Sequence, residues 1–320
     1  MSVERTINFL VSLCFYKRNA PYVWSLTILF ATTFYPITKP RSTLETLKHM
    51  KRLGNPIKFI GFRNVLQNNM TLLATALKLL TNLQTLELRL RASDGRDENV
   101  AHLLGQTTFQ LRKFGTTMEF NSEMGRFLRN QNQLRELQCS SSLTSAILTK
   151  NLLPSGTLPK LSIITWSSRL PMNVVRYITS ERPIEKVTVL VETEVPNLAP
   201  LLDIGPRSES VKQVSLMINS NNITAEQVGE IAVQFPAAQE LGMKMRKLDE
   251  NFLTQITASI HHFKSLRRLI LSANAVVFKR WEDLIQEHLA VCFEKCKTLS
   301  YLIFPVTEKD SIKFYVFRRR

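Results

Sequence analysis

One short pattern recurs along almost the whole chain and restricts how the chain can fold. It consists of an apolar residue, two variable residues, a second apolar residue, one variable residue and a third residue that is apolar or small. The eleven copies are Val23-Leu26-Ile28, Ile57-Ile60-Phe62, Leu83-Leu86-Leu88, Leu111-Phe114-Thr116, Leu134-Leu137-Cys139, Leu161-Ile164-Trp166, Ile184-Val187-Val189, Val211-Val214-Leu216, Ala238-Leu241-Met243, Leu266-Leu269-Leu271 and Leu299-Leu302-Phe304. Eight of the ten steps between successive copies measure 23 to 28 residues. Chance placement would not hold this spacing, so the chain is expected to be an array of similar units.

The geometry of a strand explains the pattern. The second and third apolar positions of each copy lie two residues apart, so in a strand they point to the same side. Such a strand is too short to bury that side alone, and neighbouring copies must stack into a parallel sheet with a shared core. The intervening segments supply the crossovers as helices. The sequence therefore predicts an α/β fold, a leucine-rich-repeat-like (ribonuclease-inhibitor-like) solenoid with parallel strands on the inner face, helices outside and about 10–11 irregular repeats.

Several intervening segments carry helix signals. Apolar residues at helical spacing predict a helix over 66–80, and another is expected over 278–295. Thr224 and Gln227 form a capping-box pattern at the start of a third helix, and Asp249 is placed to cap a fourth.

The repeats depart from a regular leucine-rich pattern. An Asn three residues after the third apolar position would join neighbouring repeats, but it occurs only as Asn219 and Asn274. We therefore expect an irregular stack with loops near 92–99 and 167–172. The predicted organisation is an N-terminal helical lead-in or cap over 1–20, one solenoid over 21–306 and a basic C-terminal tail over 307–320, which ends in Arg318, Arg319 and Arg320.

The charge of the chain leaves two interpretations open. The 42 Lys and Arg residues exceed the 26 Asp and Glu residues, for a net charge of +16 and a pI near 9.9. Such a charge favours a nucleic-acid or acidic-lipid partner. However, the basic residues are scattered, and no basic stripe with interleaved aromatic residues is visible. A solvated basic surface explains the same composition.

Export and membrane signals are weak. The uncharged stretch over 19–38 is just long enough to span a bilayer, but it contains two prolines and four threonines. The apolar segment over 7–16 is followed by no convincing signal-peptide cleavage site. Four cysteines are too few for a disulfide scaffold and indicate reduced thiols in an intracellular protein, either cytoplasmic or nuclear. No membrane association is expected.

The sequence contains no motif that predicts catalysis. A Walker-type phosphate loop, a Gly-x-Ser-x-Gly motif and a His-Glu-x-x-His motif are all absent from it. His288, Cys292 and Cys296 lie at four-residue spacing, but the outer two would be about 12 Å apart on a helix and could not share a metal ion. Core packing is the simpler explanation for both cysteines. No catalytic residue, cofactor or metal site is predicted, and the protein is not expected to be an enzyme.

Several segments resemble a known family. They are 18–28, 79–88, 109–114, 125–131, 134–137, 153–154 and 158–161. Their sequences are similar to the divergent leucine-rich-repeat proteins of fungi, basidiomycetes especially, that usually carry an F-box. The resemblance covers about residues 10 to 305. It implies a repeat region that holds the substrate of an SCF-type ubiquitin ligase, while an upstream F-box docks the ligase adaptor. Because the first repeat begins within about twenty residues of Met1, the F-box is expected to be absent.

Side chains that alternate with the core positions should face a partner. They are Glu87, Arg89, Gln138, Ser140, Thr165, Ser167, Thr188, Ser215, Met217, Lys244 and Ser272. Each of them alone is equally well explained as a solvated strand position. The predicted function is a non-enzymatic protein–protein interaction scaffold, in its specific form the substrate-recognition region of an F-box-type ubiquitin-ligase receptor that lacks its F-box. The alternative is a basic repeat protein that binds nucleic acid or acidic lipid.

Overall fold

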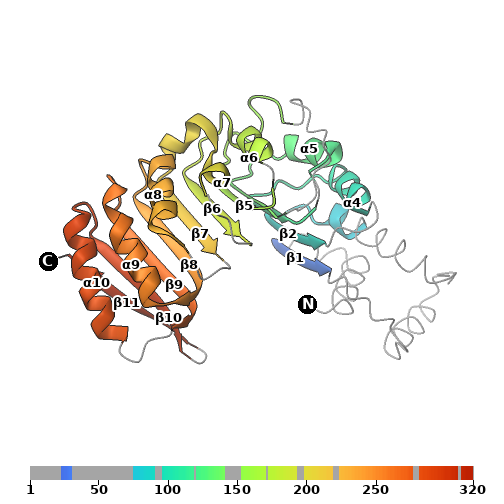
Figure 1. The fold of residues 1–320 in the computed structure, drawn as a ribbon. Helices are drawn as coiled ribbons and strands as arrows, with labels where there is room; N and C mark the ends of the chain where they lie inside the picture. The colour runs from blue at the N-terminus through green and yellow to red at the C-terminus, as the bar shows by residue number, and fades with distance from the viewer. Residues whose placement is uncertain are drawn as a thin grey trace.

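The computed structural model describes most of the chain and shows one continuous sheet. The described residues are 23–30, 75–90, 96–118, 120–140, 153–170, 172–192, 198–218, 223–276, 281–308 and 311–319. Within these ranges eleven strands form a single sheet in which the spatial order of the strands equals their order in the chain. Figure 1 shows the strands side by side along an arc, with the helices on its outer side. This is the α/β, solenoid-like arrangement that the repeated pattern predicts.

Strands alternate with helices along most of the chain. The strands are β1 (Ser25–Phe30), β2 (Thr85–Leu90), β3 (Lys113–Thr116), β4 (Glu136–Cys139), β5 (Ile163–Ser167), β6 (Lys186–Val191), β7 (Gln213–Ile218), β8 (Glu240–Leu248), β9 (Arg268–Val276), β10 (Tyr301–Glu308) and β11 (Ser311–Arg318). The helices are α4 (Arg96–Leu104), α5 (Ser122–Arg129), α6 (Met172–Thr179), α7 (Ala199–Leu202), α8 (Ala225–Gln234), α9 (Glu250–Ser259) and α10 (Trp281–Lys295), with 3-10 helices η2 (Gly205–Ser210) and η3 (Ile260–His262). β1 to β10 are parallel, and β11 runs antiparallel to β10.

The repeated apolar pattern forms the core. The second positions of ten copies are register partners from strand to strand, and every one is at most 4% exposed. This row is Leu26, Leu86, Phe114, Leu137, Ile164, Val187, Val214, Leu241, Leu269 and Leu302. Burying each such side chain contributes about 2 kcal/mol. The register confirms the predicted strand in each of these ten copies.

The first and third copies of the pattern are neighbours in the sheet. β1 pairs directly with β2, from Ser25 opposite Thr85 to Phe30 opposite Leu90. Residues 57–62 lie outside the described residues, as does the lead-in expected over 1–20.

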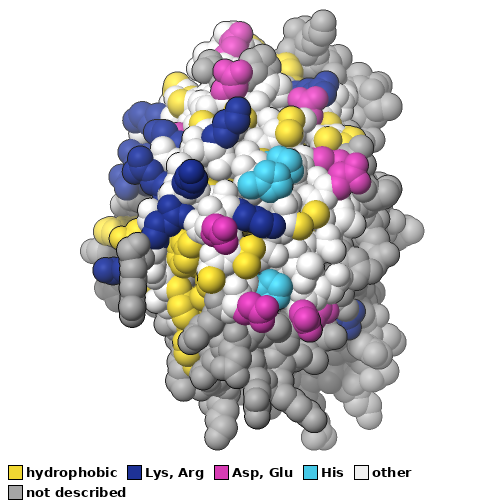
Figure 2. All heavy atoms as spheres, turned by 60° about the vertical axis from the view of Figure 1, so that its left-hand side comes forward, with side chains coloured by type: hydrophobic (Ala, Val, Ile, Leu, Met, Phe, Trp, Pro, Cys, Tyr) yellow, Lys and Arg dark blue, Asp and Glu magenta, His cyan; other side chains and the backbone are white. Residues whose placement is uncertain are grey.

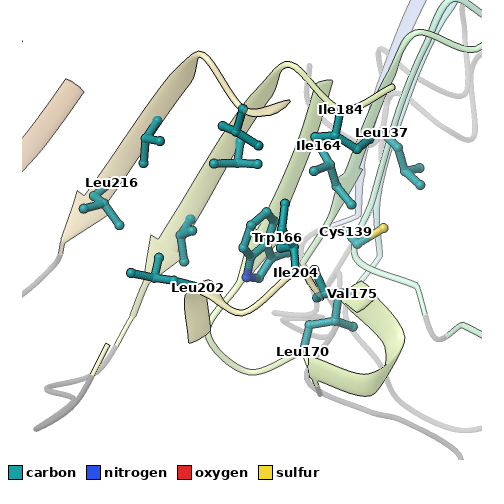
Figure 3. Close-up of a cluster of buried hydrophobic side chains, with 14 of the residues drawn as sticks. Leu137, Cys139, Ile164, Trp166, Leu170, Val175, Ile184, Leu202, Ile204 and Leu216 are labelled. Carbon is teal, nitrogen blue, oxygen red and sulfur yellow. The ribbon is translucent and has the colours of Figure 1, made fainter. Parts of the chain in front are cut away.

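Large side chains fill the space between sheet and helices. Trp166 at the end of β5 is fully buried, and its indole Nε1 donates a hydrogen bond to the Leu201 carbonyl oxygen at 3.2 Å. Figure 3 shows Trp166 surrounded by apolar side chains from neighbouring strands and from the outer layer, among them Cys139, Val175 and Ile204. One core is thus continuous from repeat to repeat.

The helix signals are correct where the structure describes them. Thr224 caps α8, its hydroxyl accepting the Gln227 amide while the Gln227 side chain returns to the Thr224 amide. The Asp249 carboxylate likewise caps α9. α10 falls within the range predicted over 278–295, and 75–79 is the described helical part of the segment predicted over 66–80. The loop expected over 92–99 is wrong in part, because α4 already begins at Arg96.

Buried polar side chains join repeats where an Asn ladder is missing. The side chain of Gln131, 1% exposed, accepts the Leu111 amide at 2.8 Å and donates to the Phe109 carbonyl at 3.3 Å. Further along, the buried guanidinium of Arg182 donates to a hydroxyl and to five carbonyl oxygens. These acceptors are the Thr157 hydroxyl and the carbonyls of Leu153, Thr157, Tyr177, Ile178 and Ser180. An amide and a guanidinium satisfy backbone groups that would otherwise be buried without partners.

The basic tail predicted over 307–320 is wrong. β10 continues to Glu308, and β11 then pairs with it antiparallel from Ser311 to Arg318. Tyr315 and Phe317 pack against the end of the core, and the Phe317 ring meets Phe304 edge-on at 6.1 Å. The charges at the C-terminus conceal this strand in the sequence, although Ile312, Phe314 and Val316 alternate as strand residues do.

Candidate functional site

The face of the sheet opposite the core presents a continuous row of side chains. The row contains the residue between the second and third apolar positions of the nine copies from Leu83 to Phe304, followed by a residue of β11, and each residue is the register partner of the next. It consists of Glu87, Gly115, Gln138, Thr165, Thr188, Ser215, Gly242, Ile270, Ile303 and Val316. With neighbouring strands about 4.8 Å apart, this middle row extends over roughly 43 Å.

The structure brings the predicted partner-facing residues together in two rows. Glu87, Gln138, Thr165, Thr188 and Ser215 belong to the middle row. A second row, two residues further along each strand, contains Ser167, Leu190, Met217, Lys244 and Ser272 in register. Ser140 directly follows β4, and its amide donates to the Thr116 carbonyl. Arg89 lies in β2, where its backbone is paired with Leu29.

Two of the predicted residues are not accessible. Ser167 is fully buried, and its hydroxyl donates to the Glu192 carboxylate at 2.8 Å and accepts the Arg169 amide at 3.3 Å. It lies where the chain leaves β5, so the turn and Glu192 cover it. Thr188 is 7% exposed, and its register partners on the two neighbouring strands are Thr165 and Ser215. The expectation that these two side chains face a partner is therefore corrected.

The middle row contains two glycines, which the sequence did not indicate as partner-facing residues. A Cβ atom at Gly115 would lie 3.2 Å from Glu87 Cγ, and one at Gly242 would lie 3.2 Å from Ser215 Oγ. The side chains of Glu87 and Ser215 therefore lie close against these two glycines, which add no side chain of their own to the face. Counting two residues on from each strand start would have identified both glycines, as well as Ile270 and Ile303.

A third row contains the first residue of each strand from β2 to β10 and the last residue of the antiparallel β11, and it is rich in charge. It contains Thr85, Lys113, Glu136, Ile163, Lys186, Gln213, Glu240, Arg268, Tyr301 and Arg318. Two ion pairs cross between strands, Lys113 Nζ to Glu136 Oε1 at 2.6 Å and Arg268 Nη2 to Glu240 Oε2 at 3.2 Å. These exposed pairs contribute less than about 1 kcal/mol each. Their charges set the local potential of the face.

Basic side chains gather at the C-terminal end of the arc. Lys264, Arg267, Lys297, Arg318 and Arg319 are all exposed there. Figure 2 shows Lys and Arg side chains concentrated on one side of this end, while most Asp and Glu side chains lie elsewhere on the same view. Part of this arrangement stabilises the fold, because Arg319 donates to the Phe293, Cys296 and Lys297 carbonyls at the C-terminus of α10. A cation at that end complements the helix dipole.

The cysteines of α10 belong to the core. Cys292 and Cys296 are buried, and Cys296 Sγ donates to the Phe263 carbonyl at 3.7 Å. Burial, aided by the neighbouring Cys296, raises the pKa of the Cys292 thiol to about 12, so the thiolate that a metal would need is disfavoured. Among the described residues, no three His, Cys, Asp or Glu side chains are grouped so as to hold a metal ion. Packing accounts for these thiols.

No described helix has both the length and the apolar character needed to cross a bilayer. Part of the uncharged stretch over 19–38 forms β1, a strand of the sheet. Comparison of the chain with protein-family models and with curated proteins gave no match in either case.

Proposed function

We propose that this chain is a non-enzymatic protein-binding scaffold of the leucine-rich-repeat type, and that its partner lies across the exposed face of the sheet. The observation that carries the proposal is the unbroken register of the middle row over ten strands. Small polar side chains along such a row can donate and accept hydrogen bonds to a partner. Because they have few rotamers to lose, the entropic cost of binding stays low.

The dimensions of the face favour a macromolecule over a small ligand. Small molecules bind in enclosed, mainly apolar pockets. The middle row instead forms a long surface, of the order of 43 Å, bordered on one side by a row that is rich in charge and on the other by the shorter row from Ser167 to Ser272. A stable protein–protein interface buries about 800 Å² on each partner, and two rows on ten strands together with a third on five offer an area of that order.

The family resemblance supplies a finer form of the proposal. If the chain acts with an SCF-type ubiquitin ligase, the protein bound to the sheet is a substrate for ubiquitination. Co-precipitation of the chain with the ligase adaptor tests this form separately. Failure of the adaptor to bind would leave the scaffold proposal intact and remove the ligase from it.

A polyanion partner is the second candidate. The basic side chains gathered at the C-terminal end of the arc favour it, because Lys and Arg that neutralise phosphates release counterions. A salt titration of binding to a single-stranded oligonucleotide tests it. If the logarithm of the affinity falls steeply and linearly with the logarithm of the salt concentration, the result supports phosphate binding. Weak binding that depends little on salt contradicts it.

The scaffold proposal is tested by blocking the centre of the face. Thr165→Arg and Ser215→Arg each place a large charged side chain on the middle row, while Thr254→Arg places the same side chain on an exposed position of α9 in the outer layer. We expect both middle-row variants to lose proteins that the wild-type chain captures from cells, and Thr254→Arg to retain them. Circular dichroism of all three variants checks that each is folded. Equal capture by all four proteins would contradict the proposal.

A further inference from the structure

The middle row changes character at the C-terminal end of the sheet. After Ser215 it continues with Gly242, Ile270, Ile303 and Val316. Ile270 and Ile303 are half-buried, and Val316 is 51% exposed. Aliphatic side chains on three adjacent strands thus form an apolar strip that solvent reaches, and Gly242 leaves a low position at its end.

Cations flank this strip on both sides. In the row that begins the strands, Arg268, Tyr301 and Arg318 are register partners, and the Arg318 guanidinium lies over the Tyr301 ring, 5.4 Å from its centroid. In the row on the opposite side lies Lys244 of β8, which is exposed and stands beside the Gly242 end of the strip. Glu240 is the acidic member of this group and is paired with Arg268 at 3.2 Å. Three cations and one anion give the C-terminal patch, defined as residues 240, 242, 244, 268, 270, 301, 303, 316 and 318, a net charge of +2.

We propose that the C-terminal patch binds an extended acidic segment of the partner protein. Aliphatic side chains of that segment pack on Ile270, Ile303 and Val316, and its carboxylates lie beside Arg318 and Lys244. Arg318 and Lys244 lie on opposite sides of the strip, so acidic residues on both sides of an aliphatic core match the patch best. This inference rests on the proposed scaffold function and specifies the chemistry of the partner.

The chemistry of the strip favours a protein segment over a nucleic acid. Proteins that bind single strands stack bases on aromatic rings, whereas the exposed side chains of this strip are aliphatic. The one aromatic ring in the patch, Tyr301, already has Arg318 over it. Charge complementarity together with apolar contact therefore points to acidic and aliphatic side chains on one chain.

Binding of defined probes to the full-length chain tests the proposal. The main probe is a fluorescein-labelled peptide of about twelve residues in which Leu pairs are flanked by Asp residues, a length that crosses the sheet in extended form. Two control peptides replace Leu by Ser or Asp by Asn. An oligothymidylate of about twenty nucleotides and vesicles containing phosphatidylserine represent the other polyanions. Fluorescence anisotropy measures the soluble probes and co-sedimentation measures the vesicles.

Variants assign the binding to the patch. Ile303→Ser and Val316→Ser remove the apolar contact, and we expect each to weaken binding of the Asp–Leu peptide about five- to tenfold. Arg318→Gln should weaken it a few-fold at low salt and less at high salt. Val233→Ser is the matched control, since Val233 is 76% exposed on α8 in the outer layer, and it should leave the affinity unchanged.

Two results would overturn the proposal. One is that the Asp–Leu peptide fails to bind, or binds Ile303→Ser and Val316→Ser with the same affinity as wild type. The other is an oligonucleotide or vesicle that binds more tightly than the peptide through Arg318, which would assign the patch to a polyanion. If Thr165→Arg and Ser215→Arg still release captured proteins while the patch variants have no effect, the scaffold function stands and this inference alone fails.

Discussion

At the scale of single residues, Arg182 shows how a buried charge can be stabilised by hydrogen bonds to backbone carbonyl oxygens. The Arg182 side chain is 4% exposed, and burial lowers the pKa of its guanidinium, while its N–H groups reach five carbonyl oxygens and one hydroxyl. We expect Arg182→Met to reduce the free energy of unfolding by about 3 kcal/mol, because these acceptors would stay buried without donors. Urea unfolding measures the change.

Two comparisons make the Arg182 prediction specific. Arg182→Lys keeps the charge but offers fewer donors in a different geometry, so it should lose part of that stability. Arg126→Ala removes an exposed arginine that pairs with Glu123, and it should cost less than about 1 kcal/mol. Equal effects of Arg182→Met and Arg126→Ala would show that the buried contacts contribute nothing.

The buried thiol of Cys139 makes stability depend on alkaline pH. Burial raises the pKa of Cys139 to about 12, whereas the pKa of a thiol in the unfolded chain is about 8.5. Between these two values the unfolded chain has lost the proton that the folded chain keeps, so stability is complete below about pH 8.5 and falls as pH rises towards 12. The expected slope is about 1.4 kcal/mol per pH unit. Urea unfolding of wild type and Cys139→Ala at several pH values should show a shallower slope in the variant. Identical slopes would contradict this assignment.

At the scale of elements, the start of α8 tests a cap that is visible in the sequence. We expect Thr224→Ala to reduce the free energy of unfolding by about 1 kcal/mol, because two amides at the start of the helix lose their partners. Thr254→Ala, at an exposed position within α9, should change it by only a few tenths of a kcal/mol. Combining Thr224→Ala with Gln227→Ala should cost less than the sum of the single changes, since both remove the same reciprocal contact. Strict additivity would mean that the two side chains act independently.

The strands and the two faces of the sheet show which parts of the structure the sequence could predict. The apolar triplets identified all ten parallel strands of the described residues, nine between Leu83 and Phe304 and one at Val23, because each triplet must bury one side of a strand. Alternation also selected Gln138, Thr165 and Ser215 as residues of the opposite face. It failed at Ser167, since the residues that cover this serine come from the following turn and from Glu192, and alternation says nothing about turns. Contacts between repeats made by Gln131 and Arg182 also left no repeated signal.

At the scale of the whole molecule, β11 closes the C-terminal end of the core. Ending the chain after Glu308 would expose the edge of β10, remove the contacts of Tyr315 and Phe317 and leave the carbonyls at the end of α10 without Arg319. Solenoids need such terminal caps for solubility. We expect the shortened chain to melt about 5 °C or more below wild type and to lose amide-exchange protection first in α10 and β10.

Substitution of Arg319 alone separates the contribution of β11 pairing from that of the Arg319 contacts at the end of α10. Arg319→Ala should cost about 1 kcal/mol and leave β11 protected from exchange. If the shortened chain kept the wild-type melting temperature, the closing role of β11 would be refuted.

The reversed direction of β11 also limits how an array of this kind can lengthen during evolution. A duplicated unit placed beyond β11 would meet an edge of opposite polarity, and its strand could not continue the ladder that every earlier unit shares. Insertion between existing units meets parallel edges on both sides. Related chains with more units should therefore keep the final hairpin and gain their extra length internally.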